Sequence, residues 1–271
     1  MPQEKRLRGR PKAFTDKGEA RIQSLERALD VLSYVSEAGG QTLSEIAGAL
    51  GTSPATTYRI LSTFAARGHL EMDAGSQTWH VGPAAFRTGN AFLHRTGMVE
   101  RARPLMRALM AETGETANLG VESGGQVLFL SQVETHEAIR AFFPPGTLSP
   151  MYASGIGKAL LAAKDLPEID RYISRTPLER FTEKTICARD ALRDELARIH
   201  AQGYAFDDEE KSPGMRCVAA PVFNAFGEVV AGISVSGPTA RLDMDEITRI
   251  CSLVRQRAGE LSHALGYAPA G

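Results

Sequence analysis

The sequence predicts an α+β protein in two parts: a small helical domain with a short hairpin, then a larger domain with an antiparallel sheet. Up to Gly68, apolar residues recur with the i, i+3, i+4, i+7 spacing of helices that bury one face. From Thr116 onward, extended runs and helices follow one another without the regular strand–helix–strand repeat of a parallel sheet. The length of 271 residues suits two domains, each with its own core.

Composition excludes several classes of protein. Hydrophobic residues make up 43% of the chain and charged residues 23%, as in ordinary globular proteins. No apolar run approaches the roughly 18 residues of a membrane span, and the N-terminus has no apolar secretion segment. The three cysteines, Cys187, Cys217 and Cys251, are widely spaced and form no CxxC pair. We therefore expect a cytoplasmic protein without disulfide, metal or cofactor, and without membrane contact.

The first part reads as three helices. The first runs from about 24 to 37. Thr42 and Glu45 have the spacing of a capping box at the start of a short second helix. Ser53 can cap a third helix, and Pro54 stands at its first position, where a missing N–H costs nothing. A helix, a short helix, a Gly-containing turn and another helix together indicate a helix-turn-helix.

The third helix buries one face and offers the other to a partner. Its inner residues are Thr57, Ile60, Leu61 and Phe64, and two short extended runs around Ala74–Ser76 follow as a hairpin wing. In such a module the second helix of the pair enters the major groove, where arginine reads guanine or phosphate and small side chains contact bases. An ordinary solvated helix in a three-helix bundle is the alternative. The predicted DNA contacts on this helix are Ser53, Ala55, Thr56, Tyr58, Arg59 and Ser62.

A basic arm precedes the helices. The stretch KRLRGRPK at residues 5–12 holds most of the positive excess of the N-terminal part, whereas the remainder of the chain is acidic on balance. We expect residues 1–20 to be disordered alone and attracted to polyphosphate, with Arg8 and Arg10 reaching a narrow minor groove. The alternative is a solubilising tail.

The remaining elements follow in order. Residues 21–82 form the predicted winged domain, 83–96 a linker helix, and 97–271 the second domain. The second domain opens with a helix at 100–112 and a hairpin whose strands TANLGVES and QVLFLSQVE meet at two glycines. An extended run, AIRAFFPPG, then leads into the helix start SPMYASGIGKALLAA. Two helices near 166–174 and 188–201, a strand YAFDDEE, a long hairpin and a helix at 244–265 complete the chain.

The long hairpin predicts a small polar cavity. If Phe223 lies opposite Glu228, one face of the hairpin is uniformly apolar. The other face then sets Cys217 against Ser234 and Met215 against Ser236, with Gly232 beside them leaving room. A solvated face of ordinary strand serines is the alternative.

A second wall for this cavity lies in ASGIGKALL. Gly155 and Gly157 bring the backbone close at a helix start, where free N–H groups and the helix dipole attract an anion. The stretch is not a P-loop, because Tyr152 stands where that motif has glycine and Ala159 where it has Ser or Thr. A carboxylate suits the site, unless Gly155 only makes a turn.

Several motifs in order resemble the IclR family of bacterial regulators. They are SLERALDVL, TLSEIAGALGTSPATTYRILSTF, the wing, ASGIGKALLA, GYAFDDEE, GMRCVAAPVFNAFGEVVAGISVSGP and the terminal helix, and together they span residues 21–266. The resemblance implies a winged helix-turn-helix, a linker helix and a GAF-like effector domain with an antiparallel sheet. It also implies homodimers that pair through the DNA-binding half, often as tetramers, on double-stranded promoter DNA.

Within the family, GETANLGV, LSPMYASGIGKALL and SVSGP are most similar to the glyoxylate-responsive members, of the allantoin-utilisation repressor and β-hydroxyaspartate-pathway regulator type. Alternatives are the same class of regulator sensing pyruvate, an aromatic acid or another organic acid, and a thiol enzyme using Cys217. No catalytic residue is predicted. By this resemblance, the residues that bind a small oxo-acid are Gly155, Ile156, Asp207, Met215, Cys217, Ser234 and Ser236, with the bulk of Ile156 narrowing the cavity.

Overall fold

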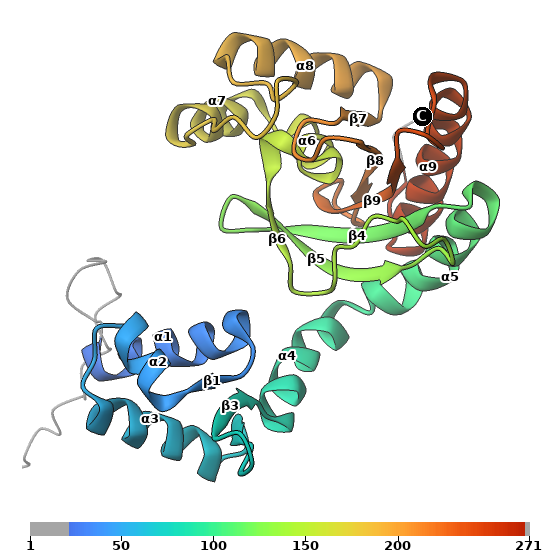
Figure 1. Ribbon diagram of the computed structural model, residues 1–271. Helices are drawn as coiled ribbons and strands as arrows, with labels where there is room; N and C mark the ends of the chain where they lie inside the picture. The colour runs from blue at the N-terminus through green and yellow to red at the C-terminus, as the bar shows by residue number, and fades with distance from the viewer. Residues whose placement is uncertain (1–21, 269–271) are drawn as a thin grey trace, which may run out of the picture. The chain divides into compact units, whose positions relative to one another are not determined.

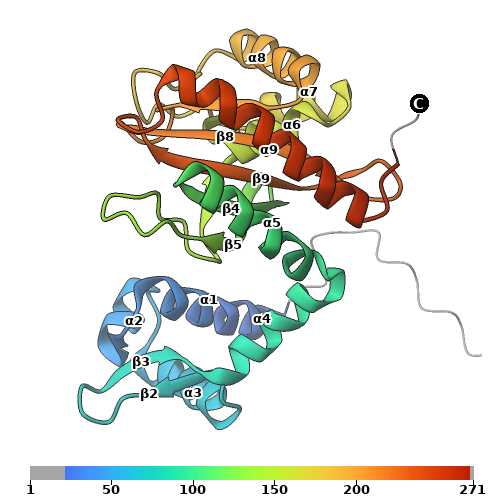
Figure 2. The ribbon, with the colours of Figure 1, turned by 90° about the vertical axis from the view of Figure 1, so that its right-hand side faces the viewer.

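The computed structural model describes residues 22–268, and the chain divides into two compact units between Phe92 and Leu93. One unit is a small helical module and the other contains a large sheet (Figures 1 and 2). The predicted basic arm, with Arg8 and Arg10, lies outside the described residues.

The N-terminal unit is a three-helix module with a small sheet. Its elements are α1 (Gln23–Ala38), β1 (Gln41–Thr42), α2 (Leu43–Ala49), α3 (Pro54–Ala66), β2 (Leu70–Met72) and β3 (Thr78–Val81), and the sheet order is β1-β3-β2. Apolar side chains from all three helices meet β2 and β3 in one core, made of Val31, Val35, Ile46, Leu61, Leu70 and Trp79. The predicted winged helix-turn-helix is therefore confirmed.

The helix starts in this unit are the predicted ones. Thr42 and Glu45 form a complete capping box, in which each side chain bonds the other residue's backbone amide. The Ser53 Oγ accepts a hydrogen bond from the Thr56 amide at 3.2 Å, and Pro54 occupies the first turn. These caps satisfy amides that the helices leave unpaired, which is why α2 and α3 begin where they do.

The helix α4 (Pro83–Thr96) contains the division between the two units. The C-terminal unit is then a six-stranded antiparallel sheet with helices on both faces (Figures 1 and 2). The strand order is β6-β5-β4-β9-β8-β7. The bounds are β4 (Thr116–Ser123), β5 (Gln126–Val133), β6 (Leu148–Pro150), β7 (Ala205–Asp208), β8 (Met215–Phe223) and β9 (Val229–Pro238).

Each face of this sheet has its own core. One face carries α5 (Met98–Thr113) and α9 (Met244–Ala264), which pack on Val218, Ala220 and Val222 of β8. The other carries a 3-10 turn, η1 (Met151–Ala153), with α6 (Gly155–Ala162), α7 (Leu166–Arg175) and α8 (Arg189–Gln202), against Ala219 of β8 among others. Successive strand residues point to opposite faces, so β8 serves both cores. Among the described helices, none is long and apolar enough to cross a membrane.

The predicted register of the long hairpin is wrong by two residues. Cys217 lies opposite Ser236, not Ser234, and Met215 lies opposite Pro238, not Ser236. One residue of the shift comes from the turn, because Phe223 pairs with Val229 and leaves Glu228 in the loop; the other comes from an irregularity next to Val222. A shift of two preserves the side-chain period of a strand, so the polar face still gathers the predicted residues.

The extended run AIRAFFPPG at 138–146 contains no strand, and the third strand of the hairpin region is the short β6. Two prolines in this run remove amide donors that a sheet edge needs, which explains why regular pairing begins only at Leu148.

Candidate functional site: a nucleic-acid helix and an anion cavity

The outer face of α3 presents the predicted contact residues. Ser53, Ala55, Thr56 and Arg59 are exposed, as is Tyr58, whereas Ser62 is half-buried. The Ser53 Oγ also donates to the Thr56 Oγ1 at 2.9 Å. The Ser53 hydroxyl is therefore already engaged in capping α3, and contact with DNA would compete with these bonds. The opposite face of the helix is held by Leu61 and by Thr57, whose Oγ1 bonds the Thr52 hydroxyl at 2.6 Å.

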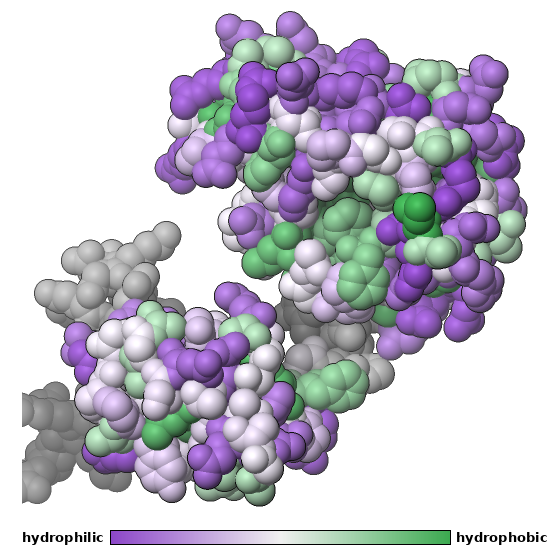
Figure 3. Space-filling model, in the orientation of Figure 1, coloured by the Kyte–Doolittle hydropathy of each residue, from purple (hydrophilic) through white to green (hydrophobic). Residues whose placement is uncertain are grey.

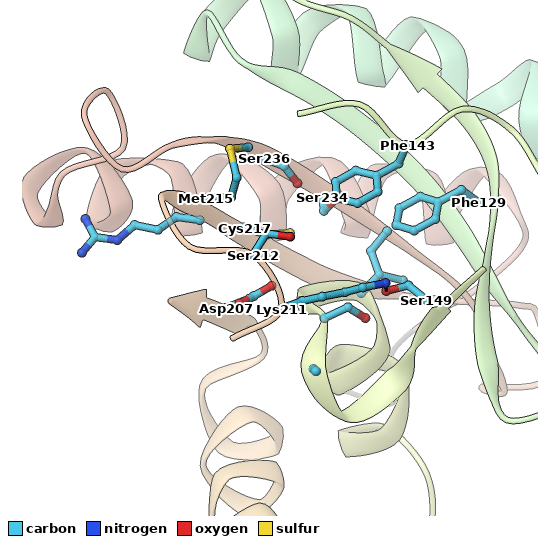
Figure 4. Close-up of a pocket in the computed structure, with 15 residues that line it drawn as sticks. Phe129, Phe143, Ser149, Asp207, Lys211, Ser212, Met215, Cys217, Ser234 and Ser236 are labelled. Carbon is cyan, nitrogen blue, oxygen red and sulfur yellow. Dashed lines mark hydrogen bonds between the residues drawn. The ribbon is translucent and has the colours of Figure 1, made fainter. Parts of the chain in front are cut away.

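In the C-terminal unit, a cavity of about 40 Å³ lies between the start of α6 and the strands β8 and β9 (Figure 4). We call it the α6–β8 cavity. All seven residues predicted to hold the oxo-acid line it, together with eight that were not predicted. The added residues are Phe129, Phe143, Ser149, Ala153, Ser154, Lys211, Ser212 and Arg216.

The first turn of α6 forms one wall. Ser154 caps the helix by accepting from the Gly157 amide at 3.2 Å, and the amides of Gly155 and Ile156 precede any intrahelical acceptor. A Cβ on Gly155 would lie 2.7 Å from the Cys217 Sγ, so only glycine lets the helix start approach β8 this closely. Two amides with the helix dipole behind them suit a carboxylate.

Ile156 fills the space that Gly232 was expected to leave open. A Cβ on Gly232 would lie 2.8 Å from the Ile156 Cγ2, and a Cβ on Gly120 would lie 3.4 Å from two Ile156 carbons. The isoleucine is thus seated on two glycines of neighbouring strands and is 1% exposed. It forms an apolar floor to the cavity.

The hydroxyls of the opposite wall are oriented by an asparagine that sequence reasoning missed. The Asn118 Nδ2 donates to the Ser234 Oγ at 3.4 Å and to the Ser236 Oγ at 3.3 Å. The Gln132 Nε2 in turn donates to the Asn118 Oδ1 at 2.9 Å, which fixes the amide's direction. Both serine oxygens therefore accept from Asn118, which leaves each hydroxyl proton to be donated to Cys217 or to a ligand. In the sequence, the signal was an asparagine between the apolar residues Ala117 and Leu119 of a predicted strand.

Burial disfavours the charged forms of two ionisable side chains that line the cavity. Burial raises the pKa of Asp207 to about 6, although its Oδ1 accepts a hydrogen bond from the Glu210 amide at 2.9 Å. Burial likewise raises the pKa of the Cys217 thiol to about 11. A nucleophilic cysteine needs a lowered pKa, so the geometry opposes the thiol-enzyme alternative.

A buried lysine lies beneath the cavity. Lys158, on α6, is 0% exposed and donates to the Phe206 carbonyl at 2.7 Å and to the Glu195 Oε1 at 3.2 Å. It also pairs with Glu210, whose pKa burial raises to about 7. This lysine ties α6 to α8 and to the end of β7, so it holds the wall that carries the two amides. A lone charge inside the apolar stretch GIGKALLA was its signal in the sequence.

Comparisons with known proteins agree with this architecture. Residues 24–74 match the IclR helix-turn-helix domain, and residues 90–263 match the family described as bacterial transcriptional regulator IclR C-terminal. The chain is 53% identical over 264 residues to the HTH-type transcriptional regulator BhcR of Paracoccus denitrificans (strain Pd 1222), covering 97% of this chain and 94% of that one.

The HTH-type transcriptional repressor AllR of Salmonella typhi is 36% identical over 267 residues, 98% of each chain. Among solved structures, the IclR protein of Thermotoga maritima superposes with a TM-score of 0.76 at 27% identity, covering 91% of this chain and 100% of that one. These relatives are named as regulators, which confirms the prediction that the chain is not an enzyme. The chain therefore belongs to the IclR family of bacterial DNA-binding transcriptional regulators.

Proposed function

We propose that this regulator is controlled by a small oxo-carboxylate, glyoxylate, bound in the α6–β8 cavity. The observation that carries the proposal is the combination of two helix-start amides and two serine hydroxyls around a cavity of about 40 Å³. In this arrangement the amides of Gly155 and Ile156 receive the carboxylate. Ser234 and Ser236 donate to the aldehyde oxygen or its hydrate. Asp207, Met215 and Cys217 complete the lining.

The size of the cavity supports glyoxylate over the alternative effectors. A water needs roughly 10–15 Å³ of such volume, so the cavity holds only a few non-hydrogen atoms. An aromatic acid does not fit without rearrangement of Phe129 and Phe143, which stack at 4.9 Å between ring centroids. Pyruvate differs from glyoxylate by one methyl group, and the Ile156 floor disfavours that addition.

Thermal stability tests the effector. Glyoxylate is expected to raise the Tm more than pyruvate or benzoate at equal concentration, because a ligand that binds only the folded state stabilises it by mass action. Ser234→Ala with Ser236→Ala is expected to weaken glyoxylate binding about ten- to hundredfold, since each hydroxyl contributes a hydrogen bond of roughly 0.5–1.5 kcal/mol.

The matched control is Ser131→Ala, which removes a buried serine of strand β5, two strands from β9 in the same sheet, that does not line the cavity. Calorimetry that finds equal glyoxylate affinity in the double variant and in unmodified protein contradicts the site. No Tm change with any of the three acids contradicts the proposed effector class.

DNA binding on the proposed surface is tested at Arg59. Arg59→Ala is expected to cost about 1–3 kcal/mol on a promoter fragment that the unmodified protein shifts, if the guanidinium reads a base edge. Arg67→Ala, at the far end of α3, is the control and is expected to change affinity little. Fluorescence anisotropy in one salt concentration compares them, and equal losses in both variants contradict a reading role for Arg59.

We also propose that Arg8 and Arg10 of the arm enter the minor groove, and that the protein acts in the cytoplasm as a homodimer or a dimer of dimers. Pairing through the DNA-binding unit is supported by Ile22, which precedes α1, and by Leu25 and Leu29 on α1, which are 64%, 54% and 50% exposed. Further association is supported by the exposed Ile139, Phe142 and Leu148 of the C-terminal unit. Figure 3 shows hydrophobic residues between hydrophilic ones on the visible face of this unit.

Control of DNA binding requires that the ligand binds two arrangements of the dimer with different affinity. In this proposal the cavity favours one arrangement when filled, and α4 carries the change to the spacing of the paired α3 helices on a palindromic site.

A further inference from the structure

The α6–β8 cavity contains a lysine that neither the sequence motifs nor the helix-start geometry assigned to the ligand. Lys211 lies in the connection between β7 and β8, residues 209–214, and its side chain crosses toward β6 (Figure 4). The Lys211 Nζ donates to the Ser149 Oγ at 3.0 Å, and Ser149 is itself 1% exposed. An ammonium group has three donors, so this contact leaves donors for a ligand.

Among the described residues, Lys211 is the cation that lines the cavity without forming an ion pair. The other lining cation, Arg216, bonds the Asp208 Oδ1 and the Leu242 carbonyl, both at 2.7 Å. Lys158 does not line the cavity and is paired with two glutamates. Within residues 22–268, no carboxylate forms an ion pair with Lys211. Burial lowers the pKa of Lys211, while the charge of Asp207 acts in the opposite direction.

The same lysine resolves a conflict in the cavity. Asp207 lines the space where an anion is to bind, and two carboxylates in one small cavity repel each other. Lys211 faces Asp207 closely enough for their charges to interact. The positive charge of Lys211 therefore attracts a ligand carboxylate and offsets its repulsion by Asp207.

We infer that Lys211 is a binding residue that pairs with the carboxylate of the effector, and that it selects anionic over uncharged two-carbon ligands. This inference rests on the proposed function, because it assigns a partner to the effector of the same cavity. The ligand's carboxylate lies between the Lys211 ammonium and the first amides of α6, while Ser149 holds the lysine side chain across the cavity.

Calorimetry with two probes tests the inference: glyoxylate, and the uncharged glycolaldehyde. Lys211→Met is expected to weaken glyoxylate binding roughly ten- to hundredfold, the range of a charge-assisted hydrogen bond, and to leave the weak binding of glycolaldehyde unchanged. Lys211→Arg retains the charge and is expected to recover most of the glyoxylate affinity.

Lys184→Met is the matched control. It removes one positive charge from a lysine that bonds Asp208 at 2.9 Å and Glu209 at 2.6 Å but does not line the cavity, so glyoxylate affinity is expected to stay within about twofold of the unmodified protein. The inference is overturned if Lys211→Met binds glyoxylate normally, if Lys184→Met loses as much, or if both probes weaken equally. Unmodified protein that binds neither glyoxylate nor pyruvate overturns the proposed function instead, and the role of Lys211 with it.

Discussion

Replacement of Lys158 by methionine is expected to destabilise the C-terminal unit by about 3–5 kcal/mol, because it removes one partner of a buried ion pair. The lysine has no exposed surface, and its loss leaves the buried Glu210 without its cation, whereas Glu195 keeps its ion pair with Arg198. Methionine has nearly the same volume, so the effect is electrostatic and not that of a cavity. Urea denaturation measures the free energy of unfolding.

The pH dependence of this variant has a definite sign. Burial raises the pKa of Glu210 to about 7, and removal of Lys158 raises it further. A carboxyl whose folded pKa is raised keeps its proton in the folded state after the unfolded chain has lost it. The variant therefore loses stability as the pH rises from about 5 to 8.

The control for Lys158 is Lys164→Met. Lys164 makes partly exposed ion pairs, to Glu122 at 2.8 Å and to Glu168 at 3.7 Å, and such pairs contribute about 1 kcal/mol or less. Glu210→Gln, added to the Lys158→Met variant, is expected to restore part of the stability by removing the unpaired charge. Equal losses for Lys158→Met and Lys164→Met contradict the buried network.

Replacement of Gly157 by alanine is expected to disrupt the start of α6. A Cβ at this position lies 2.2 Å from the Met151 carbonyl oxygen and 2.3 Å from its Cα, and a backbone contact cannot be relieved by rotating a side chain. The helix has to move away from η1, at a cost of about 1–3 kcal/mol or more. The amides of Gly155 and Ile156 move with it, so glyoxylate binding is expected to fall as well.

The control for Gly157 is Gly259→Ala in the interior of α9, where an added Cβ meets nothing within 4 Å. Alanine favours a helix over glycine by roughly 0.5–1 kcal/mol, so this variant is expected to gain stability. Differential scanning calorimetry compares the two. An unchanged Tm in Gly157→Ala means that α6 and η1 pack less closely than the structure has them.

Local signals predicted most of the fold. The caps at Thr42 and Ser53, the glycines at 124–125 and the apolar periodicity of α9 each depend on residues within a turn or two of one another. A helix start or a tight turn depends on backbone groups that are close in the chain, so a few consecutive residues suffice to predict it.

Strand pairing was predictable only in part. The alternation of β8 and β9 correctly divided their residues between two faces, but the partners were misplaced by two positions. The sheet faces follow from the side-chain period, which belongs to each strand alone. The cross-strand partners depend on where the turn closes and on one irregularity near Val222. Registers that differ by two residues bury the same side chains, so the sequence pattern does not distinguish them.

By itself, the sequence determined the α+β class, the helix-turn-helix with its exposed Arg59, and the residue types that line the cavity. The tertiary structure alone decided that Asn118 aligns the two serines, that Ile156 sits on two glycines, and that Lys211 bonds Ser149 across the cavity. Asn118 and Ser236 are separated by 118 residues along the chain. Contacts of this kind arise from which strands pair and from how helices and loops pack on the sheet, and no periodicity within a single element encodes them.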